Sequence, residues 1–146
     1  MQPRYSVSID INAPAERVFE VMTDVERWHE WTPSITGITR KRSGPLAVGE
    51  TATVRQPKFP PALWTVNDIQ PGRSFSWVNR APGLRVTGFH GAEPAPGGSR
   101  ATLSLTYEGI FGGLLARMTE GITKKYIEME ASGLKARAEN PLYRHA

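Results

Sequence analysis

Residues 99–139 read SRATLSLTYEGIFGGLLARMTEGITKKYIEMEASGLKARAE, a segment with two hydrophobic patterns and no proline. Apolar and polar residues alternate from Ala101 to Glu108, which predicts a strand with one buried face. After Gly113 the apolar residues recur instead at spacings of three and four, which predicts an amphipathic helix that ends at Glu139. Its apolar positions are Leu115, Met118, Ile122, Tyr126 and Met129. A strand and a long helix in direct succession bury both apolar faces most simply when the helix packs against a sheet.

Glycine and proline divide the preceding sequence into short segments. Of the 146 residues, 14 are glycine and 12 are proline, and this content excludes a bundle of long helices. Between Gly44 and Gly98 these residues cluster roughly every 11 positions, which is the spacing of turns in an antiparallel meander. We therefore expect seven strands, near residues 4–11, 34–42, 51–56, 62–69, 73–80, 84–91 and 99–109.

Helical signals occur at both ends of the chain. Residues 12–14, Asn-Ala-Pro, have the form of a helix start, because proline is tolerated in the first helical turn. Asp24 is expected to cap a second short helical segment that runs to about His29. In the long C-terminal helix, Gly121 and Gly133 are unfavourable and are expected to interrupt it.

The expected fold class is α+β. It consists of a curved seven-stranded antiparallel sheet, two short helices, and a long C-terminal helix across the concave face of the sheet. We expect a single domain over residues 1–146, with its core at about 4–139.

The composition excludes several classes of protein and site. Without cysteine there is no disulfide scaffold, thiolate metal site or cysteine nucleophile. No stretch approaches the roughly 18 apolar residues of a membrane span, and the start of the chain lacks the apolar block of a secretory signal. We expect a cytoplasmic protein without stable membrane insertion, as either a monomer or a homodimer. The net charge is +4, and its one basic cluster, Arg40-Lys41-Arg42, is interpreted as a solvated strand end rather than a nucleic-acid surface.

Three segments resemble a known family. Residues 11–19 (INAPAERVF) and 24–31 (DVERWHEW) resemble the opening of polyketide cyclase/dehydrase-type proteins of the START-like (SRPBCC) superfamily, and residues 126–135 (YIEMEASGLK) are similar to the end of that family's long helix. With the strand order, the resemblance covers about residues 4–139. It implies a helix-grip fold, in which the sheet and the long helix enclose a cavity that binds hydrophobic small molecules.

A cavity between sheet and helix is also expected from the residues, because the inward faces are apolar and aromatic with a few polar groups. Gly88 and Gly121 are interpreted as positions that leave space. The alternative is a solid core, and Trp28 in particular is expected to plug the end of the core. The residues expected to line the cavity are Trp31, Val54, Gln56, Trp64, Val66, Phe75, Trp77, Val86, Gly88, Leu103, Leu105, Leu115, Met118, Ile122 and Tyr126.

His90 and Tyr107 are the candidate catalytic pair. If Val86 and Gly88 face inward, His90 shares their face and approaches Tyr107, so that the two side chains are placed for acid/base work on a carbonyl or enol. The alternatives are a histidine near solvent at a strand end, or the opposite inward set. Glu128 and Glu130 are interpreted as solvated charges.

Other chemistries lack their motifs. The three histidines, His29, His90 and His145, do not have a metal-ligand spacing, and no nucleotide fingerprint or nucleophile elbow is present. No metal, cofactor or nucleic-acid partner is therefore expected. The sequence favours binding or transport of a hydrophobic or aromatic small molecule. A polyketide cyclase or dehydratase is the first alternative. A protein-interaction module like the chaperone-activator relatives is the second, and it predicts a collapsed cavity and an exposed apolar patch.

Overall fold

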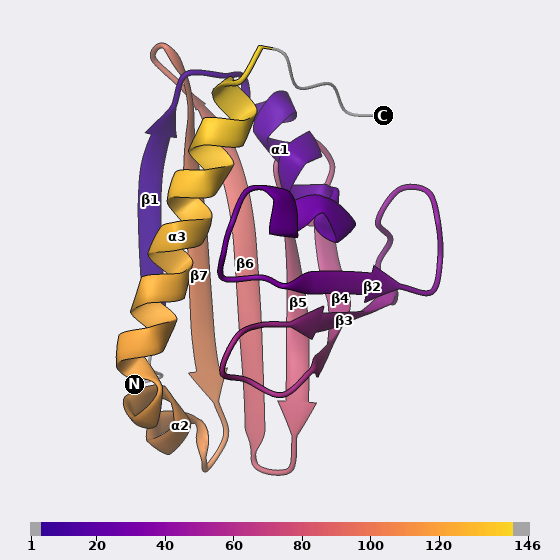
Figure 1. Cartoon of the computed structure of the whole chain (residues 1–146), viewed down its shortest axis with the longest axis vertical. Coiled ribbons are helices and arrows are strands. Elements are labelled where there is room, and N and C mark those ends of the chain that lie inside the picture. The colour runs from indigo at the N-terminus through magenta and orange to yellow at the C-terminus, as the bar shows by residue number, and fades with distance from the viewer. Residues whose placement is uncertain (1–3, 142–146) are drawn as a thin grey trace.

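Seven antiparallel strands form one sheet in the order β1-β7-β6-β5-β4-β3-β2 (Figure 1). The structure, a computed structural model, describes residues 4–141. The strands are β1 (Arg4–Ile11), β2 (Gly37–Arg40), β3 (Thr51–Arg55), β4 (Ala62–Gln70), β5 (Ser74–Ala81), β6 (Leu84–Ala95) and β7 (Gly98–Glu108). The helices are α1 (Ala15–Thr23), the 3-10 helix η1 (Val25–Glu30), α2 (Gly112–Met118) and α3 (Glu120–Glu139). The chain crosses from one edge of the sheet to the other through α1 and η1, and then returns by successive hairpins until β7 pairs with β1.

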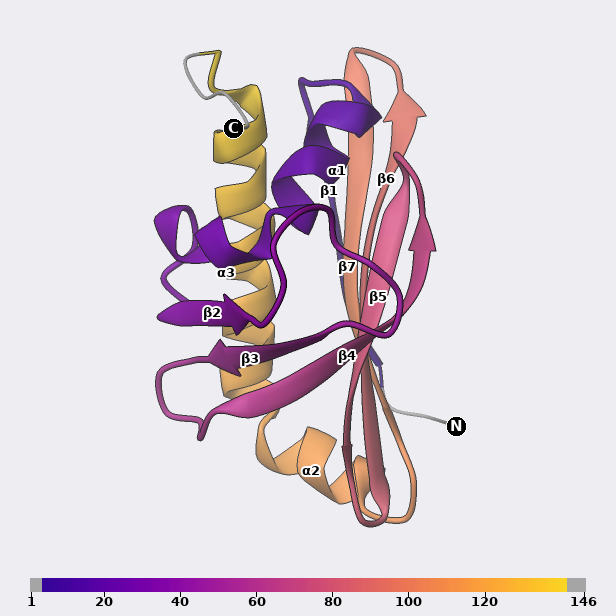
Figure 2. The same ribbon diagram turned by 90° about the vertical axis from the view of Figure 1, so that its right-hand side faces the viewer.

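The sheet curves around α3. Figure 2 shows β2 and β3 turned out of the plane of β5–β7 toward the helix, so that the sheet grips α3 from two sides. Near one end of α3, α1 packs against α3, β6 and β7, and at the other end α2 packs against β6 and β7. This arrangement confirms the predicted curved seven-stranded sheet with a long C-terminal helix.

The predicted single helix over residues 113–139 is wrong in one respect, because it is two helices. The break is at Thr119, whose hydroxyl donates a hydrogen bond of 2.8 Å to the carbonyl of Leu115. Gly121 and Gly133, the expected points of interruption, both lie inside α3. A Cβ atom at Gly133 would collide with the carbonyl oxygen of Trp31, so this glycine allows the helix to approach the backbone after η1.

Two strand boundaries also differ from expectation. The strand expected at 34–42 is only Gly37–Arg40, because the flanking residues form loops. The strand expected at 84–91 extends to Ala95 and pairs with β7 from Arg85 to Ala95.

The sequence predicts that the basic cluster at the end of β2 is solvated, but one of its three side chains is buried. Arg40 forms a buried ion pair with Glu50 and donates hydrogen bonds to the carbonyl oxygens of Gly44 and Pro45. The interpretation as a solvated strand end is therefore wrong for Arg40, although Lys41 and Arg42 are exposed. Arg40 fastens the loop between β2 and β3.

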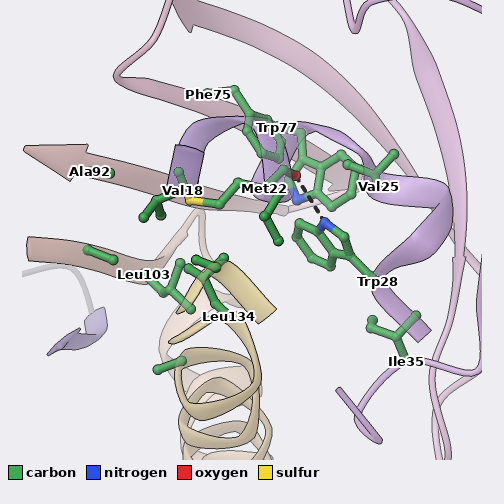
Figure 3. Close-up of a cluster of buried hydrophobic side chains, with 14 of the residues drawn as sticks. Val18, Met22, Val25, Trp28, Ile35, Phe75, Trp77, Ala92, Leu103 and Leu134 are labelled. Atoms are coloured by element: carbon green, nitrogen blue, oxygen red, sulfur yellow. Dashed lines mark hydrogen bonds between the residues drawn. The ribbon is translucent and has the colours of Figure 1, made fainter. Parts of the chain in front are cut away.

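A continuous core fills the end of the grip that α1 and η1 cover (Figure 3). Val18 and Met22 of α1 meet Phe75 of β5 and Leu134 of α3, and all four side chains are buried. The indole of Trp28 closes this core by donating a hydrogen bond of 2.9 Å to the carbonyl of Met22. Trp28 thus plugs the end of the core, as predicted.

Candidate functional site: a cavity between the sheet and α3

A cavity of about 350 Å³ lies between the inner face of the sheet and α3. It begins beside Trp28 and His90, next to the filled core, and extends to Leu115 of α2. Most of the residues expected at the site line it, namely Val54, Gln56, Trp64, Trp77, Val86, Gly88, His90, Leu103, Leu105, Tyr107, Leu115 and Tyr126. The concave face of the sheet is therefore only partly filled by α3 and the side chains around it.

Five expected lining residues lie elsewhere. Val66 and Phe75 are fully buried in the core, because α1 and η1 cover their end of the sheet. Trp31 is half-buried against Trp28, with ring centroids 5.5 Å apart. Met118 is 74% exposed, because the break at Thr119 lets α2 turn this side chain outward. Ile122 faces a separate surface pocket.

The two glycines expected to leave space do not make room for a ligand in the cavity. A Cβ atom at Gly88 would lie 3.1 Å from two atoms of the Trp77 indole, so Gly88 makes room for that ring rather than for a ligand. Gly121 is exposed and borders the same surface pocket as Ile122. The interpretation of both glycines is corrected accordingly, and the cavity results from the arrangement of larger side chains.

The strand register separates the expected catalytic pair. Val86, Gly88 and His90 do face inward, but His90 is opposite Leu103 and Tyr107 is opposite Val86. Four residues along a strand correspond to roughly 13 Å, so the imidazole and the phenol do not meet. The expectation that His90 approaches Tyr107 is wrong, because the β6–β7 turn sets a different register.

His90 is part of an aromatic cluster and is not at a solvated strand end. Its ring stacks on Phe75 at a centroid distance of 4.5 Å and meets the edges of Trp28 and Trp77 at 5.2 and 5.8 Å. Burial lowers the pKa of His90 to about 3, and a hydrogen bond with the backbone of Phe75 only partly opposes this effect. The imidazole is therefore neutral at pH 7. Its Nδ1 atom is buried and has no hydrogen-bond partner within residues 4–141.

Two tyrosine hydroxyls connect the segments that surround the cavity at the end away from α1. Tyr126 of α3 donates a hydrogen bond of 2.6 Å to the carbonyl of Pro57, and its ring meets Phe59 edge-on. This contact ties the β3–β4 loop to the helix. On the opposite wall the ring of Tyr107 meets that of Tyr5 edge-on at 6.0 Å. The hydroxyl of Tyr5 donates to the carbonyl of Ala116 at 2.7 Å, which holds α2 against the sheet.

Glu130 is the functional candidate that the sequence analysis missed. The sequence predicts a solvated charge at this position, but the side chain lines the cavity and accepts a hydrogen bond of 3.2 Å from the hydroxyl of Ser34. Ser34 in turn shares a hydrogen bond of 2.7 Å with the Thr32 hydroxyl. Burial raises the pKa of Glu130 to about 7, although the bond from Ser34 favours the carboxylate. The missed signal was helical spacing, because Glu130 follows Tyr126 by four residues and therefore shares its face.

The described residues show neither a metal cluster nor a helix that could span a membrane. Within residues 4–141, no group of three or more His, Asp or Glu side chains is placed to hold a metal ion, and His145 lies outside these residues. None of the helices in this range is long and apolar enough to cross a membrane.

Comparison with known proteins identifies the fold. The sequence matches the family model described as polyketide cyclase / dehydrase and lipid transport over residues 2–139. No curated protein matches it. The structure is similar to the aromatase/cyclase Zhui from Streptomyces sp. R1128, with 16% identity, a TM-score of 0.76, and coverage of 98% of this chain and 97% of that chain.

Two further solved structures show the same likeness. TTHA0849 from Thermus thermophilus is 21% identical, with a TM-score of 0.72 over 93% of this chain and 97% of that chain. Ara h 8.0201 is 14% identical, with a TM-score of 0.72 over 94% and 98% of the two chains. These matches confirm the predicted resemblance to SRPBCC polyketide cyclase-type proteins and the helix-grip fold.

Proposed function

Because this chain belongs to the polyketide cyclase / dehydrase and lipid transport family, we propose that it binds a hydrophobic or aromatic small molecule in its cavity and releases it unchanged. The family and the fold indicate either hydrophobic ligand binding or a polyketide cyclase-type function. The observation that favours binding is the cavity itself. A volume of about 350 Å³ is within the range of small-molecule sites, and its walls are mainly aromatic and aliphatic with few polar groups.

The geometry of the candidate acid/base groups argues against turnover. His90 is a weak base because its pKa is about 3, far from the pH at which a general base is efficient. Tyr107 is separated from it by four residues of strand register. Under this proposal both side chains shape the wall of the binding site, together with the other lining residues.

A cyclase or dehydratase is the second candidate, and Glu130 is the observation that favours it. A cavity-lining carboxyl with a pKa of about 7 is suited to acid/base work at neutral pH. The test is incubation with a linear poly-β-ketone thioester. We expect cyclisation no faster than in buffer, whereas acceleration that disappears in Glu130→Gln would favour the enzyme.

A protein-interaction module is expected to have a collapsed cavity. The open cavity of about 350 Å³ argues against this alternative. Its other expectation, an exposed apolar patch, has a counterpart at α2 and the turn before it. The exposed residues there are Ile110, Phe111, Leu114 and Met118.

Calorimetric titration tests the binding proposal. We expect 2-naphthylmethanol, a neutral aromatic probe, to bind the protein at a single site, and native mass spectrometry of the purified protein to detect a co-purified small molecule. Leu105→Trp fills the cavity from β7 and is expected to abolish binding. Leu63→Trp introduces the same ring at a residue that is 53% exposed and is expected to leave binding unchanged. Equal binding by both variants would place the site elsewhere.

A further inference from the structure

The charge of the cavity wall differs from that of the whole chain. The sequence carries a net charge of +4, yet in the part of the chain that the structure describes no Lys or Arg side chain lines the cavity. Glu130 is the one carboxyl group among the lining residues there. The other titratable side chains that face the cavity are His90 of β6, Tyr107 of β7 and Tyr126 of α3.

The aromatic surface of the cavity also favours positive charge. Three indole rings that line it form a connected row, with Trp28 and Trp77 at a centroid distance of 5.5 Å and Trp77 and Trp64 at 5.8 Å. The face of an indole carries a negative partial charge and attracts ammonium groups, most strongly where water is excluded. A carboxyl group and a row of indoles therefore give the cavity a single electrostatic preference.

Hydrogen bonds hold the carboxyl group in place. Thr32 and Ser34 lie in the loop after η1, are almost completely buried, and share a hydrogen bond. Ser34 then donates to Oε2 of Glu130 at 3.2 Å. The hydrogen bond from Ser34 occupies one lone pair of one carboxylate oxygen. No other hydrogen bond to the Glu130 side chain is present among the described residues. The carboxylate thus retains acceptor capacity toward the cavity.

We propose that the cavity binds hydrophobic amines in their protonated form, with Glu130 as the counter-ion and the indole row as the apolar surface, and that it rejects carboxylates. This inference rests on the proposed ligand-binding function and specifies the ligand class. A half-buried carboxylate that faces an apolar cavity without a cation is unfavourable, and an ammonium group on the ligand supplies the missing partner. An anionic ligand would instead place two negative charges in a cavity that no described Lys or Arg side chain lines.

Three probes of one shape test the proposal by calorimetric titration: 2-naphthylmethylamine, 2-naphthylmethanol and 2-naphthoate. At pH 8 we expect the amine to bind at least tenfold more tightly than the alcohol, and the carboxylate to bind at least tenfold more weakly than the alcohol. Since Glu130 must lose its proton to pair with the amine, affinity for the amine is expected to fall roughly tenfold per pH unit below about 7. His90 remains neutral in this range, and affinity for the alcohol is expected to stay constant.

Two isosteric variants locate the effect. Glu130→Gln removes the cavity charge and is expected to weaken amine binding at least tenfold while changing alcohol binding less than twofold. Glu128→Gln removes the same charge from the exposed side of α3 and is expected to leave all three affinities unchanged. Because neutral-probe binding reports on folding, a loss confined to the amine is not explained by misfolding.

The outcomes distinguish failure of the amine preference from failure of the proposed ligand-binding function. If the alcohol binds but the amine binds no better, or if Glu130→Gln leaves amine affinity unchanged, the amine preference is wrong and ligand binding stands. If none of the three probes binds, both the preference and the proposed function are overturned.

Discussion

The two ends of the grip are built from the same strands and the same helix, yet one end is filled and the other is hollow. At the filled end, Phe75 and Leu134 are fully buried among residues of α1 and η1. At the hollow end, the buried cluster contains only Val86, Tyr107 and Ala116 of the described residues, and half-buried side chains such as Leu105 border the cavity.

The difference comes from the short helices. Helix α1 directs Val18 and Met22 into the concave face, whereas α2 directs mainly Leu115 and Ala116 inward and leaves Leu114 and Met118 exposed. The sheet and α3 therefore set the size of the interior, and the short helices determine how much of it stays open.

The largest expected effect compares two leucines on helices. Leu134→Ala removes a fully buried side chain at the filled end and is expected to lower the free energy of unfolding by roughly 3–5 kcal/mol. Leu115→Ala removes a half-buried side chain that already borders a void, so we expect a loss of about 1 kcal/mol. Urea denaturation measures both values. Equal losses would mean that the two ends are packed alike.

The second effect concerns His90, at the boundary between the ends. Its pKa is lowered from 6.5 to about 3, so between these pH values the unfolded chain binds a proton that the folded protein does not. The stability from His90 is fully present above pH 6.5 and is lost as the pH falls toward 3. His90→Phe keeps the stacking on Phe75, and at pH 4 we expect this variant to be roughly 3 kcal/mol more stable than wild type. At pH 8 the difference is expected to be below about 1 kcal/mol. A pH-independent difference would contradict this account.

Glu130, at the hollow end, is expected to have a smaller effect on stability with the opposite pH dependence. Its pKa is raised from 4.5 to about 7, so the folded protein binds the extra proton and becomes less stable as the pH rises from 4.5 to 7. At pH 8 we expect Glu130→Gln to be roughly 2–3 kcal/mol more stable than wild type, and at pH 4 to match it. Thermal unfolding at the two pH values measures this, with the exposed Glu128→Gln as control. The idea fails if Glu128→Gln shows the same pH dependence.

Two glycines give the smallest effects. A Cβ at Gly88 presses on Trp77, so Gly88→Ala is expected to cost about 1–3 kcal/mol. A Cβ at Gly121 meets nothing within 4 Å, and Gly121→Ala is expected to stabilise α3 by about 1 kcal/mol. If both substitutions stabilise the protein, the close approach of Trp77 to Gly88 is not a packing contact.

The fold was predictable because its signals are local. The alternation after Ala101 and the helical spacing up to Glu139 each depend on nearby residues, and turn residues mark the hairpins. The same alternation identified the inward side chains of β7, and through them much of the cavity wall.

The interior of the site was less predictable because it depends on contacts between distant segments. The separation of His90 from Tyr107 follows from the tight β6–β7 turn, which pairs Ala95 with Gly98. Placing a two-residue turn at Pro96-Gly97 is enough to predict this register from the sequence. The exposure of Met118 depends on the break at Thr119, which no proline marks. The position of Glu130 cannot be predicted from its charge, because the residue lies on the same helix face as Tyr126 and therefore lines the cavity.

Xenon binding to a crystal of the protein tests the central claim most directly, since xenon enters dry apolar cavities and avoids packed cores. We expect xenon density in the cavity bounded by Trp64, Leu105 and Leu115, and none between Phe75 and Leu134. Density at the Phe75–Leu134 end, or no density beside Leu105, would contradict the contrast between a filled and a hollow end.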